Sequence, residues 1–154
     1  MQIILLTHSR EISKKTNTGQ LVQQLIPDTQ IIIWQRTQPD KNLLTLIASE
    51  KTALIYPVKE SESSANINDF ENFILIDSTW QEARKIVNRS SYLQNLPRVE
   101  IVPEKPSVYQ LRRNQVEGGL CTAECVIELL REKKCFDKAD NLEGVFEQFI
   151  APSL

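Results

Sequence analysis

A short apolar run followed at once by a polar cluster most constrains the fold of this chain. Residues 73–76 read Phe-Ile-Leu-Ile, which is typical of a buried strand, and the cluster Asp77-Ser78-Thr79-Trp80 follows directly. Open α/β sheets bind their ligands at the carboxyl ends of the strands. The cluster offers a carboxylate, hydroxyls and a broad aromatic ring, which can accept a proton, orient a polar ligand and stack on a flat one. We therefore expect Asp77, Thr79 and Trp80 to belong to the functional site.

Strand-like and helix-like segments alternate along the chain. The expected strands cover residues 2–7, 30–34, 52–56, 73–76 and 98–102, and the expected helices cover 19–26, 41–49, 79–89, 121–133 and 142–150. Parallel strands need crossover connections, which are usually helices. The order therefore predicts an α/β fold, with a mostly parallel sheet and helices on both faces.

The composition is that of an ordinary globular domain. With 154 residues, we expect a single domain over residues 1–154. The net charge of -2 gives no global signal for nucleic acid, although Arg and Lys residues gather locally. The 3 cysteines lack zinc-binding spacing, so we expect no metal. No run is long enough to cross a membrane and the first residues do not resemble a signal peptide, which predicts a cytoplasmic protein.

A polar segment, Lys15-Thr16-Asn17-Thr18-Gly19, leads into the first expected helix. The exposed N–H groups of a helix start favour an anion, so this segment is a candidate site for a carboxylate or a phosphate. The alternative is that Thr18 simply caps its own helix.

The only histidine, His8, follows the first expected strand, and Glu11 comes three residues later. A structural hydrogen-bonding role and a contact with substrate are both open for His8. We expect Glu11 to fix the tautomer of the ring. For the Asp77 cluster, the alternative is that Asp77 or Ser78 caps the following helix while Trp80 packs in the core.

A last polar region precedes the helix expected at 121–133. It contains Tyr109-Gln110-Leu111-Arg112-Arg113, a Gly-Gly pair and then Leu120-Cys121-Thr122-Ala123-Glu124. The glycines allow the backbone to approach a flat ligand closely. The alternative is an ordinary loop followed by a capped helix, in which Glu124 is favourable because of the helix dipole.

Taken in order, these motifs resemble the DTW-domain family. The resemblance rests on Thr7 and Glu11 with residues 15–19, on Asp77-Ser78-Thr79-Trp80, and on Tyr109-Gln110-Leu111-Arg112 with Cys121-Thr122-Ala123-Glu124. It implies a tRNA-uridine aminocarboxypropyltransferase related to the SPOUT class, with a knotted cofactor site near the C-terminal part. Many relatives carry an N-terminal cysteine cluster that looks like a zinc ribbon, and we expect this domain to lack it.

The resemblance implies a cofactor, a partner and a set of site residues. The cofactor is S-adenosylmethionine, whose 3-amino-3-carboxypropyl group would pass to N3 of a uridine in tRNA. Asp77 is the expected base, with Thr79 and Trp80 beside it, and Trp80 would pack on the cofactor or on the uracil. Expected cofactor contacts are Tyr56, Pro57, Val58, Asp77, Trp80, Leu120, Cys121, Thr122 and Glu124; expected substrate contacts are His8, Lys15, Thr16, Asn17, Thr18, Gly19, Arg84, Tyr109, Arg112 and Arg113.

Other functions remain open at this point. A SPOUT-like RNA methyltransferase would use the same cofactor and move its methyl group. A non-catalytic RNA-binding module would bind RNA without the cofactor. An α/β enzyme acting on small molecules is favoured slightly by the acidic charge balance.

Overall fold

A single parallel sheet forms the centre of the molecule. The structure is a computed structural model that describes residues 1–15, 17–101 and 120–151. Its sheet is 5-stranded, in the order β2-β1-β4-β3-β5, and the paired strands run parallel. The strands are β1 (Gln2–Thr7), β2 (Thr29–Ile33), β3 (Thr52–Ile55), β4 (Asn72–Asp77) and β5 (Arg98–Val99). The predicted α/β class with a parallel sheet is confirmed.

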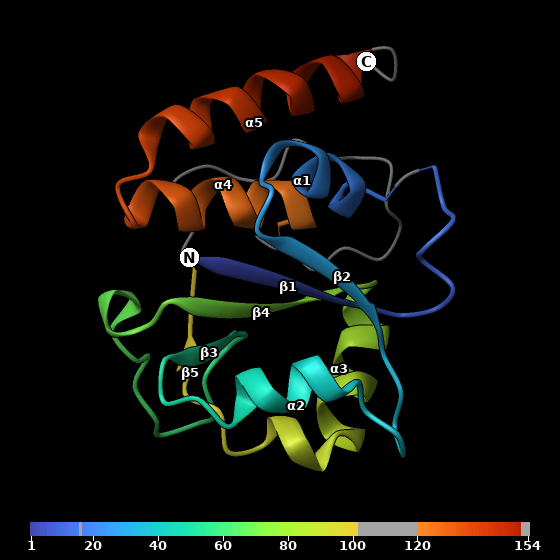
Figure 1. Ribbon diagram of the computed structural model, residues 1–154, viewed down its shortest axis with the longest axis vertical. Helices are drawn as coiled ribbons and strands as arrows, with labels where there is room; N and C mark the ends of the chain where they lie inside the picture. The colour runs from blue at the N-terminus through green and yellow to red at the C-terminus, as the bar shows by residue number, and fades with distance from the viewer. Residues whose placement is uncertain (16, 102–119, 152–154) are drawn as a thin grey trace.

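Helices cover both faces of this sheet (Figure 1). One face carries α1 (Gly19–Leu25), α4 (Thr122–Glu132) and α5 (Phe136–Ile150), and the other carries α2 (Lys41–Ile47) and α3 (Trp80–Arg89). Short 3-10 turns lie at η1 (Ile67–Asp69) and η2 (Ser91–Leu93). No helix in the described part of the chain is both long and apolar enough to span a membrane.

The two apolar cores explain why the central strands are hydrophobic throughout. Side chains of a strand alternate between the faces of its sheet. In β1, Ile3 and Leu5 pack beneath α1, α4 and α5, whereas Ile4 and Leu6 pack against α2 and α3. A strand covered on both sides needs apolar residues at successive positions, and residues 3–6 of β1 are all Ile or Leu.

The last helix is longer than the sequence predicts. The prediction began at residue 142 and took Val145, Phe146 and Phe149 as the apolar stripe, whereas α5 begins at Phe136. Its buried residues are Ala139, Leu142, Phe146 and Ile150. Ala139 extends the buried stripe of α5 into a segment that is mostly charged or polar. Because its side chain is small, it does not stand out as an apolar position in the sequence, so the first turns of α5 were missed.

The pairing of β1 with β4 determines which residues lie together at the carboxyl edge of the sheet. Their register sets Thr7 opposite Asp77, at the carboxyl end of each strand. The chain leaves both strands here and enters the segments that precede α1 and α3. This edge of the sheet is therefore where the polar motifs are brought together.

Candidate functional site at the carboxyl edge of the sheet

The carboxylate of Asp77 lies where the sheet edge meets the starts of two helices. Asp77 ends β4 and is 0% exposed. Its Oδ1 accepts a 2.7 Å hydrogen bond from the hydroxyl of Thr122, the first residue of α4. The Thr7 hydroxyl lies 3.5 Å from Oδ2 and makes its shorter hydrogen bond, 3.1 Å, to the carbonyl of Leu5. The Thr122 hydroxyl thus supplies the short hydrogen bond to a side chain that water does not reach.

Gly19 lets the start of α1 approach the same carboxylate. A Cβ at this position would lie 2.6 Å from Oδ2 of Asp77 and 2.9 Å from Oδ1 of Asn17. Both distances are shorter than side-chain carbon atoms tolerate. Glycine is thus required here by the close packing of α1 against the end of β4.

Asn17 and Thr18 hold the start of α1 in this position. Asn17 Oδ1 accepts the N–H of Gly19 at 2.7 Å, and its Nδ2 donates to the carbonyl of Glu11 at 2.9 Å. The hydroxyl of Thr18 accepts the N–H of Ala123 at 3.0 Å, which ties α1 to α4. The alternative in which Thr18 caps its own helix is therefore wrong, because its side chain makes no capping bond.

Thr79 caps α3, so the alternative that gave this role to Asp77 or Ser78 is wrong. The Thr79 hydroxyl accepts the N–H of Glu82 at 3.2 Å, and Oε1 of Glu82 accepts the N–H of Thr79 at 3.2 Å. This reciprocal capping box is signalled by the spacing Thr-x-x-Glu. The Thr79 hydroxyl is therefore engaged in this capping box, whereas the side chain of Asp77 points toward α1 and α4.

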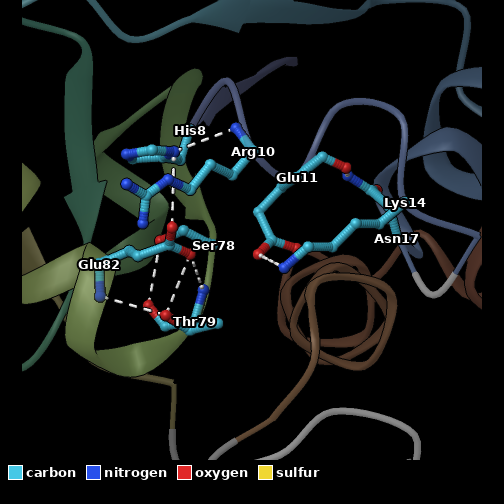
Figure 2. A network of polar contacts seen from close by, with 8 residues as sticks. All are labelled: His8, Arg10, Glu11, Lys14, Asn17, Ser78, Thr79 and Glu82. Atoms are coloured by element: carbon cyan, nitrogen blue, oxygen red, sulfur yellow. Dashed lines mark hydrogen bonds and ion pairs between the residues drawn. The ribbon is translucent and has the colours of Figure 1, made fainter.

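His8 is oriented by Arg10 and Glu82 (Figure 2). Its Nδ1 accepts the N–H of Arg10 at 3.1 Å and lies 3.5 Å from Oε2 of Glu82. We expected Glu11 to fix the tautomer of this ring; its carboxylate instead binds Nζ of Lys14 at 2.8 Å.

Glu82 lies between opposing influences on its ionisation. Burial raises its pKa, but hydrogen bonds from the Thr79 backbone and hydroxyl, a hydrogen bond with the Glu11 carboxyl and the nearby His8 lower it. The net result is a pKa below the ordinary value of 4.5. The carboxylate of Glu82 is therefore the favoured form at neutral pH.

An aromatic pair stands at the ends of β3 and β4. The rings of Tyr56 and Trp80 stack with centroids 5.7 Å apart and planes 15° from parallel. The Arg98 guanidinium lies 5.3 Å from the centroid of the Tyr56 ring. Burial raises the pKa of Tyr56, and the positive charges of Arg98 and Arg84 act in the opposite direction. Trp80 is half-buried and belongs to neither apolar core, which contradicts the core-packing alternative.

The start of α4 completes the arrangement. Cys121 is 1% exposed, and its N–H donates to Oε1 of Glu124 at 3.1 Å. Burial and the Glu124 carboxylate raise the pKa of the Cys121 thiol. The thiol is thus a neutral, enclosed group beside the Thr122 hydroxyl.

The structure brings most of the predicted site residues to one edge. His8, Asn17, Thr18, Gly19, Asp77, Thr79, Trp80, Cys121, Thr122 and Glu124 lie at strand ends or helix starts there, with Tyr56 after β3 and Arg84 in the second turn of α3. Lys15 and Pro57 are exposed, and Val58 and Leu120 are half-buried. Thr16, Tyr109, Arg112 and Arg113 lie outside the described residues.

Sequence analysis missed three residues of this edge. Glu82 was recognisable from its capping-box spacing, whereas nothing in the sequence singles out Arg98. Trp34 follows β2; its ring stacks on His8 with centroids 6.2 Å apart, and its Nε1 donates to Ser90 at 2.7 Å. Across the described ranges, no group of 3 or more His, Cys, Asp and Glu side chains could hold a metal ion.

A buried carboxylate at the carboxyl edge of a parallel sheet, between two helix starts and beside an aromatic pair, defines an α/β protein with a candidate site at the sheet edge. More specifically, the chain belongs to the DTW domain family, which it matches over residues 1–154. Family membership was expected from the ordered motifs and is confirmed.

Curated relatives share the domain at low identity. The chain is 26% identical over 137 residues to tRNA-uridine aminocarboxypropyltransferase 2 of Drosophila melanogaster, covering 84% of this chain and 55% of the relative. The proteins of the same name from Macaca fascicularis and Mus musculus are 25% and 24% identical; the matches cover 80% and 88% of this chain and 44% and 50% of those relatives. The chain thus spans about half the length of these relatives. No solved structure matches it.

Proposed function

We propose that this protein transfers the 3-amino-3-carboxypropyl group of S-adenosylmethionine to N3 of a uridine in tRNA, giving acp3U and methylthioadenosine. The proposal draws on membership of the DTW domain family and on the name that the curated relatives carry. The structural observation that supports it best is the meeting of Asp77 with Thr122 and Gly19. This contact unites segments that the family resemblance had picked out separately.

The charges of the site suit the donor. The sulfonium and ammonium groups make S-adenosylmethionine a net cation. Asp77 ends β4, Glu82 and Glu124 lie in the first turns of α3 and α4, and Glu11 is paired with Lys14. We propose that Leu120, Cys121 and Thr122 flank the adenosine and that the SPOUT-like knot forms this part of the site. When bound, the donor supplies an electrophilic carbon on a sulfonium, so that the N3–C bond forms as the C–S bond breaks.

In this proposal Asp77 accepts the proton of uridine N3. N3 is protonated at neutral pH and must lose this proton as it attacks, while the departing thioether needs none. A buried carboxylate is a suitable base when its surroundings hold it in place. Thr122 and Gly19 fix its position, and the hydroxyl of Thr122 would orient it toward the base.

Asp77→Asn separates this role from a purely positioning one. The amide oxygen of Asn can still accept the hydrogen bond from the Thr122 hydroxyl, but the amide cannot act as a base. If Asp77 is the base, transfer falls about 10²- to 10⁴-fold while donor affinity stays within a few-fold of wild type. Near-normal transfer by the Asn variant, with loss in Asp77→Ala alone, would assign Asp77 to positioning.

The direct test is incubation with S-adenosylmethionine and unmodified tRNA, followed by mass spectrometry of the nucleosides. The proposal expects acp3U at one position and an equal amount of methylthioadenosine. A methylated nucleoside would instead identify a SPOUT-like methyltransferase. RNA binding without donor binding in calorimetry would identify a non-catalytic module.

The RNA backbone is proposed to contact basic residues. Arg84 is exposed on α3, and Arg112 and Arg113 follow the same expectation from sequence. Changing Arg112 and Arg113 together to Ala should weaken tRNA binding and flatten its salt dependence. Unchanged tRNA affinity would remove both from the RNA-binding face.

A further inference from the structure

We infer that Tyr56, Trp80, Arg84 and Arg98 form a platform that stacks an unpaired base of the RNA and holds its phosphate, and that the donor binds elsewhere on the sheet edge. This inference rests on the proposed function for the identity of the RNA. It also changes a prediction from sequence, which placed Tyr56 at the cofactor, and it chooses between the cofactor and the uracil, which were both open for Trp80.

The geometry of the pair is that of a stacking surface. Tyr56 and Trp80 lie 15° from parallel at 5.7 Å, and each is only half-buried. The Trp80 ring belongs to neither apolar core, whereas the Tyr56 ring packs, partly buried, at the margin of the core that contains Ile74 and Ile86. Aromatic rings at a protein surface stack on nucleobases of any sequence.

The positive charges beside the two rings indicate which kind of ligand the platform would bind. The Arg98 guanidinium lies 5.3 Å from the Tyr56 ring centroid and its Nη1 donates to the carbonyl of Pro57 at 3.1 Å, so the cation is held in place. Arg84 adds a second positive charge close enough to act on the Tyr56 hydroxyl. The nearby carboxylate of Glu100 accepts the N–H of Val58 at 2.7 Å.

Two arginines beside stacked rings favour a polyanion and disfavour a cation. S-adenosylmethionine is a net cation, which suits the side of the edge that holds Asp77 better than the side that holds the two arginines. Asp77 points to the α1 and α4 face, where it lies against Gly19 and Thr122. The stacked rings of Tyr56 and Trp80, with Arg84 and Arg98, lie on the side of α3 and β5.

Tryptophan fluorescence tests which ligand reaches the platform. The chain has 2 tryptophans, so Trp34→Phe leaves Trp80 as the only reporter. A short single-stranded oligouridylate should quench Trp80, and S-adenosylmethionine should leave it unchanged. Quenching by the donor and not by the RNA would overturn the inference.

Substitutions test the energetics in the full chain. Trp80→Leu and Tyr56→Leu should each weaken oligouridylate binding by about 5- to 150-fold, with donor affinity unchanged in calorimetry. Phe136→Leu is the matched control, because Phe136 is an exposed aromatic residue at the start of α5, and it should change neither affinity. Lost donor affinity with intact RNA affinity would overturn the inference.

Arginine variants test the phosphate contact without altering the packing of the apolar cores. Arg84→Gln and Arg98→Gln should each lower the slope of log affinity against log salt by about 0.7 for single-stranded RNA. Arg131→Gln is the control, because Arg131 pairs with Asp140 and Glu143 between α4 and α5. Unchanged slopes in both platform variants would contradict a phosphate contact.

The two proposals fail in different ways. If wild type forms acp3U but Trp80→Leu keeps its KM for tRNA, the platform is wrong and the proposed function stands. If no nucleoside product forms but RNA quenches Trp80 and depends on Arg98, the platform stands and the proposed function is wrong.

Discussion

The Thr122 hydroxyl donates a 2.7 Å hydrogen bond to the carboxylate of Asp77 across 45 residues of sequence. It joins the start of α4 to the end of the central strand β4. Because Asp77 is fully buried, this donor replaces water that the carboxylate would otherwise have.

Replacing Thr122 by Val removes the donor without changing the shape of the side chain. We expect Thr122→Val to lower the free energy of unfolding by about 1–3 kcal/mol, because a buried oxygen of Asp77 loses its hydrogen-bond donor. Thr122→Ser keeps the hydroxyl and should lose less than half of this. Urea unfolding of the three proteins measures the difference; equal loss in the Val and Ser variants would show that packing, and not the hydrogen bond, matters here.

Two glycines provide a matched test of close packing. In Gly19→Ala the new Cβ would meet Oδ2 of Asp77 at 2.6 Å, so we expect a loss of about 1–3 kcal/mol in the free energy of unfolding. At Gly144, exposed within α5, a Cβ meets nothing within 4 Å. Gly144→Ala should therefore stabilise the protein by about 0.5–1 kcal/mol. Chemical denaturation checks both signs, and a neutral Gly19→Ala would contradict the close approach.

The lowered pKa of Glu82 should make the free energy of unfolding depend on pH. Its pKa is lower in the folded protein than its ordinary value of 4.5, so the unfolded chain binds more protons at acidic pH. The stabilisation is present above pH 4.5 and is lost as the pH falls through the lower, folded-state pKa. Glu82→Gln should flatten the decline in this acid range, measured by urea unfolding from pH 7 to pH 3.

The control for this measurement is Glu147→Gln, since Glu147 is exposed on α5. It should leave the acid-range slope close to that of wild type. If Glu82→Gln and wild type lose stability in parallel as the pH falls, the hydrogen bonds at the start of α3 do not favour ionised Glu82.

The buried thiol of Cys121 and the half-buried thiol of Cys125 should be chemically inert. Burial raises the pKa of Cys121, with a further contribution from Glu124. Burial, followed by the charges of Glu128, Glu132 and Glu124, raises the pKa of Cys125 to about 12. We expect neither to react with iodoacetamide at pH 8 until the protein is unfolded in urea, as measured by peptide mass spectrometry. Rapid labelling of Cys121 in the folded protein would contradict this.

Local patterns were sufficient to predict the framework. Residues 73–76 and residues 3–6 are apolar at every position, so β4 and β1 lie where they were expected. The α5 boundary was missed because its first buried residue, Ala139, is too small to mark a stripe among charged neighbours. Periodicity therefore locates elements well and their ends poorly.

The partners within the site could not be predicted in this way. Sequence suggested Thr18 as a cap for its own helix and Asp77 or Ser78 as a cap for the next. In the structure Thr18 bonds Ala123, and Asp77 bonds Thr122. These contacts depend on how α1 and α4 lie together over the sheet, which is a property of the three-dimensional packing and not of any local segment.

The register that sets Thr7 opposite Asp77 has a consequence for evolution. A deletion or insertion of a single codon within β4 would turn Asp77 toward α2 and α3 and bring an apolar side chain to the junction of the other helices. Lineages that keep this chemistry should therefore accumulate length changes in the connecting loops and almost never inside the two central strands.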